Sequence, residues 1–210
     1  TMSARDTVTP ITHDERQKRL KALQHSLPAF ELDAVMITPG ASMRYLFGLT
    51  WRETERLVCA VVSTKRVVFV CPKFEDTALL AALPTPHDFA WWEEHEDPRS
   101  VVTTVLSENN CIRVGVDPSC SYGQVFALGN LTAATLTSAG PVLQSLRSQK
   151  SASEIALMQA AKTLTLDVHV AIFEWIKPGI RMSEVIAEID RLHRAGGADN
   201  GSFFCAVQFG

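Results

Sequence analysis

Short apolar runs rich in β-branched residues alternate with helical segments through the first 140 residues of the chain. Buried strands typically have this length and composition, and the intervening segments have the apolar spacing of amphipathic helices. The alternation predicts an α/β layer structure. We expect strands at 33–37, 57–63, 66–71, 87–92, 111–116 and 134–137, and helices at 13–27, 42–47, 73–83, 98–107 and 122–128.

One pair of these runs limits the sheet type. Only Thr64 and Lys65 separate the runs 57–63 and 66–71, which favours a β-hairpin. A hairpin pairs its strands antiparallel, whereas strands joined through helices are parallel. We therefore predict a mixed sheet flanked by helices.

The pattern changes after Gly140. Ser151 and Glu154 form a capping-box sequence that opens a long helix to Trp175, and a second helix is predicted over 183–194. A strand is expected over 202–209. The polar stretch 144–153 separates the two patterns, so we expect a disordered segment 1–12, a first domain over 13–147 and a second beginning at 148.

Composition excludes several classes of protein. The chain is 46% hydrophobic, which is too apolar for a disordered protein, and a net charge of −3 provides no basic surface for nucleic acid or anionic membrane. The longest stretch without charged residues, 118–146, is interrupted by polar residues and glycines, and the first residues have no apolar signal segment. We expect a cytoplasmic protein that binds neither nucleic acid nor membrane.

The cysteines and the ionisable residues suggest no catalytic apparatus. The five cysteines are odd in number and contain no C-x-x-C pair, so buried reduced thiols are expected. Phosphate-binding, nucleophile-elbow and H-E-x-x-H motifs are all absent from the sequence. Asp190 and His193 have a spacing that suits a metal, but two ligands do not make a site, and an exposed i,i+3 pair is expected instead.

The order of motifs resembles one family. RSQKSASEIALM at 147–158 is similar to the R-x-x-K-x-x-x-E-I-x-x-M junction of the creatinase/prolidase/aminopeptidase P family, and PGIRMSE at 178–184 to its P-G-x-x-x-x-E segment. YLFG at 45–48 and VGVD at 114–117 also fit. The resemblance extends over about residues 13–210 and is strongest for prolidase-type Xaa-Pro dipeptidases.

The resemblance implies a fold and an activity. The fold would be a creatinase-like mixed α/β domain followed by the first helices and strand of an α+β pita-bread metallopeptidase domain. The implied activity is hydrolysis of the bond before proline in a dipeptide or short peptide. Two divalent ions, Mn²⁺ with Zn²⁺ or Co²⁺ also accommodated, would activate the water. A homodimer is also implied.

The implied metal ligands, two Asp, one His and two Glu, would all lie beyond Gly210. No catalytic residue and no metal ligand can therefore be assigned within the chain. We expect these 210 residues to be part of a longer enzyme and to be inactive and free of catalytic metal alone. One departure is Arg181, where relatives often have a Thr that caps the second helix; Arg cannot cap, so this helix start is expected to fray.

Three residues are candidates for substrate binding. Trp51 and Arg52 lie in the segment from which the family's first domain would reach an active site, often that of a partner subunit. An aromatic ring packs on proline and a guanidinium binds a carboxylate, although domain packing for Trp51 and an ion pair of Arg52 with Glu53 or Glu55 are the plainer interpretations. On the last strand, alternation would turn one of Phe203 and Phe204 to the core and the other, Phe203 in our prediction, to substrate.

Two other functions remain open. The chain is also compatible with a creatinase-type amidinohydrolase, which needs no metal, and with a non-catalytic binding module that keeps the scaffold. The charge balance disfavours a histone binder, which would more often be acidic. The residues that follow Gly210 would discriminate among these functions.

Overall fold

The computed structural model describes residues 6, 8–83 and 86–209. Residues 12–149 form one compact unit, and a second unit takes in residues 150–209 together with the described residues before Thr12. Each unit is described by itself below. The predicted disordered segment 1–12 falls in part on residues 1–5 and 7, which lie outside the described residues.

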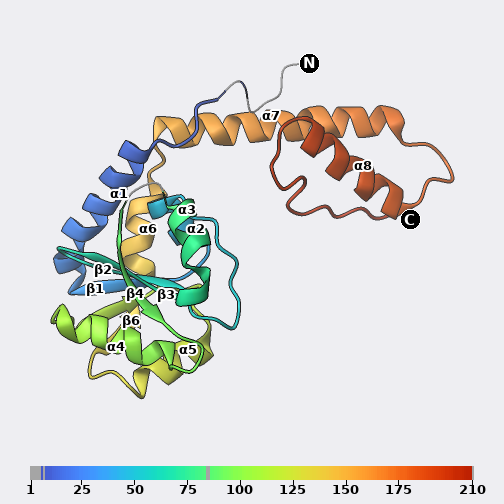
Figure 1. The fold of residues 1–210 in the computed structure, drawn as a ribbon. Helices are drawn as coiled ribbons and strands as arrows, with labels where there is room; N and C mark the ends of the chain where they lie inside the picture. The colour runs from blue at the N-terminus through green and yellow to red at the C-terminus, as the bar shows by residue number, and fades with distance from the viewer. Residues whose placement is uncertain (1–5, 7, 84–85, 210) are drawn as a thin grey trace. The chain divides into compact units, whose positions relative to one another are not determined.

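The first unit contains a six-stranded mixed sheet in the order β4-β3-β2-β1-β5-β6 (Figure 1). β2 pairs antiparallel with both β1 and β3, whereas the β1–β5, β5–β6 and β3–β4 pairs are parallel. The predicted mixed sheet is thus confirmed. The strands are β1 (Ala34–Ile37), β2 (Cys59–Ser63), β3 (Val67–Pro72), β4 (Asp88–Trp92), β5 (Arg113–Val116) and β6 (Thr135–Ser138).

Helices cover both faces of this sheet. Side chains alternate between faces along a strand, so one strand contributes to two cores. On β2, Ala60 and Val62 face one core while Cys59 and Val61 face the other. The first core contains residues of α1 (His13–Ser26), η2 (Leu27–Phe30), α2 (Ala41–Phe47), α3 (Asp76–Ala82) and α6 (Gly140–Ser148), and the second contains residues of α4 (Pro98–Glu108) and α5 (Tyr122–Gly129).

The predicted hairpin is confirmed between β2 and β3. Val61 of β2 pairs with Val68 of β3, and Ser63 closes the connection. The Ser63 hydroxyl oxygen accepts hydrogen bonds from the backbone N–H groups of Arg66 at 3.0 Å and Lys65 at 3.4 Å. A short polar side chain that satisfies turn amides explains how so brief a connection reverses the chain.

Two features of the first unit differ from the sequence prediction. A short 3-10 helix, η3 (Lys73–Glu75), precedes α3, so the predicted helix 73–83 is divided. The polar segment expected from residue 144 is helical, because α6 runs from Gly140 to Ser148 with Pro141 in its first turn. Val142 and Leu143 of α6 are buried, so a short apolar face among polar residues is enough to hold this helix against the core.

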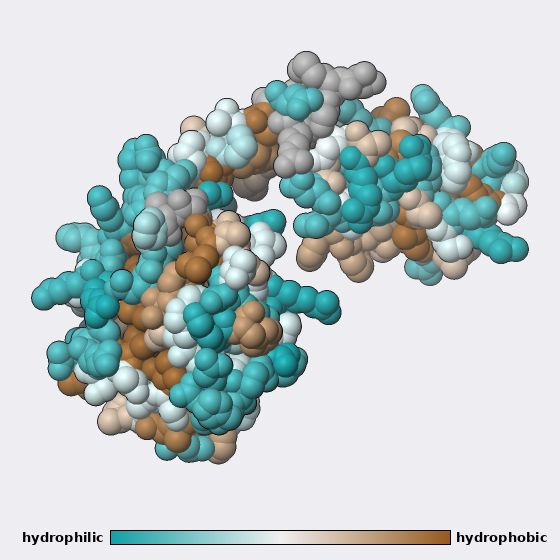
Figure 2. All heavy atoms as spheres, in the orientation of Figure 1, coloured by the Kyte–Doolittle hydropathy of each residue, from teal (hydrophilic) through white to brown (hydrophobic). Residues whose placement is uncertain are grey.

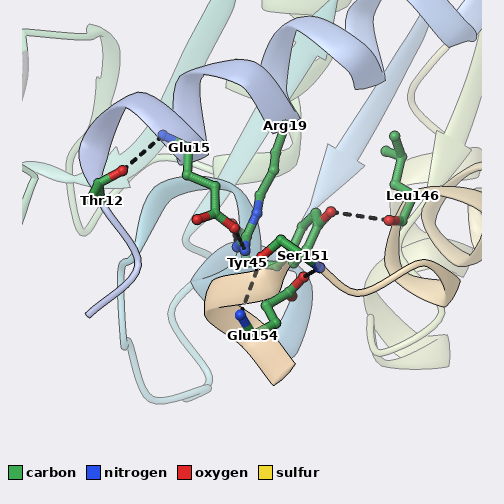
Figure 3. Close-up of polar contacts among 7 residues, drawn as sticks. All are labelled: Thr12, Glu15, Arg19, Tyr45, Leu146, Ser151 and Glu154. Atoms are coloured by element: carbon green, nitrogen blue, oxygen red, sulfur yellow. Dashed lines mark hydrogen bonds and ion pairs between the residues drawn. The ribbon is translucent and has the colours of Figure 1, made fainter. Parts of the chain in front are cut away.

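The second unit contains α7 (Ala152–Trp175) and α8 (Met182–Ala195). The capping box of α7 is confirmed: Ser151 Oγ accepts from Glu154 N at 3.2 Å, and the Glu154 carboxylate accepts from Ser151 N at 2.9 Å (Figure 3). At the start of α8 the Glu184 carboxylate accepts from Arg181 N at 2.8 Å. Glu184 thus satisfies one backbone donor at the α8 start, where Arg181 cannot act as an acceptor.

The predicted strand 202–209 is wrong. Residues 202–209 form no strand ladder with any of the described residues. A strand is stabilised by the backbone hydrogen bonds of a neighbouring strand, and no such neighbour exists in the described second unit. The expectation that Phe203 or Phe204 faces a core is also wrong, because their exposed fractions are 104% and 81%.

Apolar side chains reach the surface of the second unit (Figure 2). Only Val168 of α7 is buried, and α7 is by length and composition long and apolar enough to cross a membrane. The same composition occurs in core helices of soluble proteins, so this observation is weak evidence for a membrane span. Large exposed apolar residues on α7 are Ile155, Met158, Leu166, Val170, Phe173 and Trp175.

Candidate functional site

The segment that contains Trp51 and Arg52 begins at Gly48, which ends α2 in the left-handed conformation at φ 72°. A Cβ at Gly48 would lie 2.6 Å from the guanidinium carbon of Arg16 on α1, far inside van der Waals contact. The positive φ value therefore favours glycine here, and a larger residue would also displace the Arg16 side chain. The glycine that closes α2 sets the direction in which the chain leaves toward Trp51.

Further contacts hold the next residues. The Arg44 Nε donates to Thr50 Oγ1 at 3.1 Å, which ties the segment back to α2. Trp51 is partly buried and packs against the first core, in agreement with the plainer interpretation of domain packing. Arg52 is exposed, and no hydrogen bond or ion pair is recorded for it in the part of the chain that the structure describes.

One of the two carboxylates expected beside Arg52, that of Glu55, is engaged elsewhere. Glu55 pairs with Arg56 at 2.7 Å, and Arg56 also pairs with Glu94 at 2.8 Å. These contacts raise the pKa of the Arg56 guanidinium, chiefly through its hydrogen bond to Glu94. The buried indole N–H of Trp92 donates to Leu57 O at 3.0 Å and fixes the end of the segment beside β4.

A small pocket of about 280 Å³, part of it open to solvent, lies beside this segment. Thr38, Glu53, Cys120 and Gln124 are among its lining residues. Burial, together with the nearby charges of Glu53 and Asp117, raises the pKa of the Cys120 thiol to about 11. The thiol is therefore protonated near neutral pH and is a poor nucleophile.

Asp117 directly follows β5, and the sequence pattern there indicated only that a strand ends. It is 3% exposed, and its Oδ1 accepts hydrogen bonds from Ser119 N at 3.0 Å and Ser119 Oγ at 2.8 Å. Its backbone N–H also donates to Met36 O, which joins the ends of β5 and β1. Asp117 thus shapes the turn after β5, a role that its D-P-S sequence could have suggested.

No group of three or more His, Cys, Asp or Glu side chains among the described residues could hold a metal ion. The donor set that a dinuclear centre needs is therefore not provided by residues 6, 8–83 and 86–209. No catalytic step through a metal can be derived from these residues.

Phe203 belongs to the second unit, whereas Trp51 and Arg52 belong to the first. Phe203 lies in the segment after α8.

The prediction that Asp190 and His193 form an exposed pair on this helix is wrong. His193 is 8% exposed, and its Nδ1 lies 2.8 Å from Ile189 O and its Nε2 3.4 Å from Thr165 Oγ1 on α7. His193 therefore packs between the two helices, while Asp190 contacts Arg194 and Ser202.

The YLFG segment has a structural role. The Tyr45 hydroxyl donates to Leu146 O at 3.1 Å, and the Arg19 guanidinium lies 4.2 Å from the Tyr45 ring centroid (Figure 3). Arg19 also donates to Tyr45 O at 3.0 Å and to the Glu15 carboxylate at 2.6 Å. One aromatic residue thereby joins α1, α2 and α6.

The first unit is thus a three-layer α/β domain, a mixed sheet with helices on both faces, and a capped pair of helices follows it in the chain. Residues 19–149 match the model of the creatinase/prolidase N-terminal domain. The chain belongs to this family.

Relatives and solved structures agree with the assignment. The chain is 27% identical over 204 residues to an uncharacterized peptidase of Schizosaccharomyces pombe, covering 89% of this chain and 44% of the relative. It is 28% identical over 161 residues to a probable dipeptidase PepE of Mycobacterium bovis, covering 75% of this chain and 43% of the relative. The crystal structure of dipeptidase PepE from Mycobacterium ulcerans has a TM-score of 0.82 at 23% identity, covering 93% of this chain and 53% of that chain.

A recombinant prolidase of Thermococcus sibiricus shows the same fold, with a TM-score of 0.82 at 17% identity, covering 93% of this chain and 53% of that chain. The chain spans less than half the length of the two curated relatives named above. The named relatives and solved structures are peptidases, dipeptidases and a prolidase, and the expected family is confirmed.

Proposed function

We propose that the whole protein is a metal-dependent Xaa-Pro peptidase, a prolidase-like dipeptidase that hydrolyses the bond before proline. The observation that supports this proposal is the match of residues 19–149 to the creatinase/prolidase N-terminal domain, with similarity to a peptidase continuing over 204 residues. The first unit alone would not explain similarity of that length. Two divalent ions, Mn²⁺ or alternatively Zn²⁺ or Co²⁺, would be bound by residues outside this chain.

In this proposal Trp51, Arg52 and Phe203 contact a proline-containing dipeptide or short peptide. Exposure of Arg52 and Phe203 leaves both side chains accessible to a ligand. Part of the Trp51 side chain packs against the first core, and this packing fixes the orientation of the part that remains exposed. A side chain on a rigid support loses little entropy when it binds.

The exposed apolar residues of α7 and α8 support a longer protein. Contiguous apolar surface of this kind marks a contact with another part of a protein or a partner. We propose that the rest of the protein covers this surface, and that α7 does not enter a membrane. Charged side chains recur along α7 at Glu154, Lys162, Asp167 and Glu174, which a lipid-facing helix would have to desolvate.

The test compares two proteins: the 210-residue chain, and the same chain extended by the remainder of its natural protein. Each is incubated with Mn²⁺ and assayed for hydrolysis of an Xaa-Pro dipeptide, with an Xaa-Ala dipeptide as the control substrate. We expect the extended protein to bind metal and release proline, and the 210-residue chain to do neither. Hydrolysis by the 210-residue chain would contradict the proposed location of the metal ligands.

The same assay separates the alternatives. Hydrolysis of creatine without metal would identify a creatinase-type amidinohydrolase, and inactivity of the extended protein with either substrate would favour a non-catalytic binding module. We also propose a cytoplasmic homodimer, which light scattering of the extended protein and fractionation of its source cells would test.

A further inference from the structure

The chain segment after α8 is held by one carboxylate. Asp190 Oδ1 accepts a hydrogen bond from the backbone N–H of Ser202 at 3.0 Å, and Oδ2 accepts from Arg194 Nε at 2.7 Å. Arg194 also donates from its terminal guanidinium nitrogen to Asn200 O at 3.2 Å. Arg194 therefore fixes the backbone at Asn200, six residues further along, and Asp190 fixes it at Ser202, twelve residues further along.

Gly201 allows the backbone to approach Asp190. Its φ is +69°, in the left-handed region, and a Cβ at this position would overlap Oδ1 of Asp190. Any larger residue would have to displace the carboxylate or the loop. The glycine and the carboxylate are therefore matched to each other.

The contact lies directly before the two exposed aromatic residues. Ser202 precedes Phe203, and no strand ladder among the described residues supports residues 202–209. The bond from Ser202 N to Asp190 is thus the side-chain contact recorded nearest to Phe203. The Arg194 hydrogen bond also lowers the pKa of the Asp190 carboxyl, so the group is ionised at neutral pH and accepts both bonds as an anion.

We propose that Asp190, together with Arg194, is a positioning residue that fixes the backbone before Phe203 so that its ring contacts the apolar part of the substrate. This inference rests on the proposed Xaa-Pro peptidase function. Asp190 does not itself touch substrate. It acts through the direction of the Phe203 backbone, and a small displacement of a contacting group lowers activity strongly.

The experiment uses the full-length protein with Asp190→Ala, and Glu188→Gln as the matched control. Glu188 lies on the same helix and pairs with Arg191 at 2.6 Å, but its recorded bonds do not reach the segment after α8. We expect Asp190→Ala to raise KM for an Xaa-Pro dipeptide about tenfold with a smaller change in kcat. Glu188→Gln should leave KM within about twofold, because exposed pairs contribute little.

A second measurement follows the backbone directly. Asp190→Ala should speed hydrogen exchange at the Ser202 amide, whereas Glu188→Gln should not. Arg194→Gln leaves the Ser202 bond in place and should show a smaller effect in the same direction. Gly201→Ala should disturb the native protein more than it disturbs the Asp190→Ala variant, because the carboxylate it would displace is then gone while the cost of the left-handed φ remains in both.

The outcomes are distinct. Faster exchange at Ser202 with an unchanged KM would overturn the inference while the peptidase function stands, and so would an unchanged exchange rate. If the wild-type protein hydrolyses no Xaa-Pro dipeptide, the proposed function fails and the inference falls with it. A raised KM with native-like circular dichroism and faster Ser202 exchange would support the inference.

Discussion

The hydroxyl of Tyr45 donates a hydrogen bond to the backbone carbonyl of Leu146, which lies 101 residues further along the chain. The bond joins α2, near the start of the first unit, to α6 at its end. The guanidinium of Arg19, on α1, stacks on the Tyr45 ring. The two ends of the first unit are therefore held together by a polar contact as well as by the apolar core.

Replacing Tyr45 with Phe should destabilise the first unit by about 1 kcal/mol, because Leu146 O loses its donor while the ring keeps its packing. Urea unfolding followed by fluorescence measures the change. The matched control is Tyr122→Phe, since Tyr122 is 80% exposed and should tolerate the loss of its hydroxyl. Equal effects of the two substitutions would contradict a specific role for the Tyr45 hydroxyl.

Gly48→Ala should cost about 2 kcal/mol, because alanine disfavours the left-handed conformation and its Cβ would press on the Arg16 guanidinium. Gly123 provides the control, since it lies within α5 and a Cβ there would meet no atom within 4 Å. Gly123→Ala should be neutral or stabilising by up to about 1 kcal/mol. Thermal unfolding of both variants tests the contrast, and a neutral Gly48→Ala would refute it.

The stability of the first unit should depend on the protonation of His87. Its ring is half-buried, with ring centroids 5.0 Å from that of Phe69 and 5.9 Å from that of Phe47. Burial lowers the pKa of His87, the charge of His13 lowers it further, and Asp88 opposes both. The unfolded chain, with an ordinary pKa of about 6.5, therefore binds the proton more readily than the folded one.

The His87 contribution should accordingly be complete above about pH 6.5 and be lost as the pH falls through this value. Urea unfolding at about pH 7.5 and about pH 5.5 should show a larger loss for the native protein than for His87→Phe, which keeps an aromatic ring. His25→Gln changes an exposed histidine and should follow the native protein. Parallel losses in native protein and His87→Phe would exclude this histidine as the cause.

The thiols should differ sharply in reactivity. All five cysteines are free, and Cys59, Cys71 and Cys111 are buried. Burial raises the pKa of Cys59 and Cys71, and Cys120 titrates at about 11. In native protein at about pH 8, iodoacetamide should modify the half-exposed Cys205 first, and Cys120 should react faster with each step toward pH 11. Mass spectrometry after urea unfolding should find all five modified.

The 210-residue chain should associate as its concentration rises, because apolar residues of α7 and α8 are exposed. Phe173, at 82% exposed, tests this directly. Phe173→Glu should shift the concentration dependence in analytical ultracentrifugation toward the monomer, whereas Lys65→Glu, a change at an exposed lysine in the β2–β3 turn of the first unit, should not. A stable 23.1 kDa monomer at all concentrations would argue against an uncovered surface.

Local patterns were sufficient to predict most of the first unit. The two-residue connection at Thr64 and Lys65 specified the hairpin, and Ser151 with Glu154 specified the start of α7, because each signal lies within a few residues. α6 was missed because its apolar face is short. The strand 202–209 was predicted from composition, but a strand depends on a neighbouring strand that can lie anywhere in the chain.

The candidate site was predicted less completely. The resemblance pointed to the segment after Gly48. Arg44 holds this segment from six residues before Thr50, but Arg16 and Trp92 reach it from distant parts of the sequence. The turn that Asp117 shapes is local, but the role of Asp190 depends on the Ser202 amide, which the fold brings to its carboxylate from twelve residues away. Such pairings are set by tertiary structure, and spacing along one element does not reveal them.

The strand order has a consequence for how the sheet can assemble during synthesis. The three central strands, β1, β2 and β3, are all complete by Pro72, and each later strand joins an outer edge. β4 extends the sheet beside β3, β5 beside β1, and β6 beside β5. A nascent chain emerging from the ribosome can therefore build this sheet outward from its centre, and no strand has to separate a pair that has already formed.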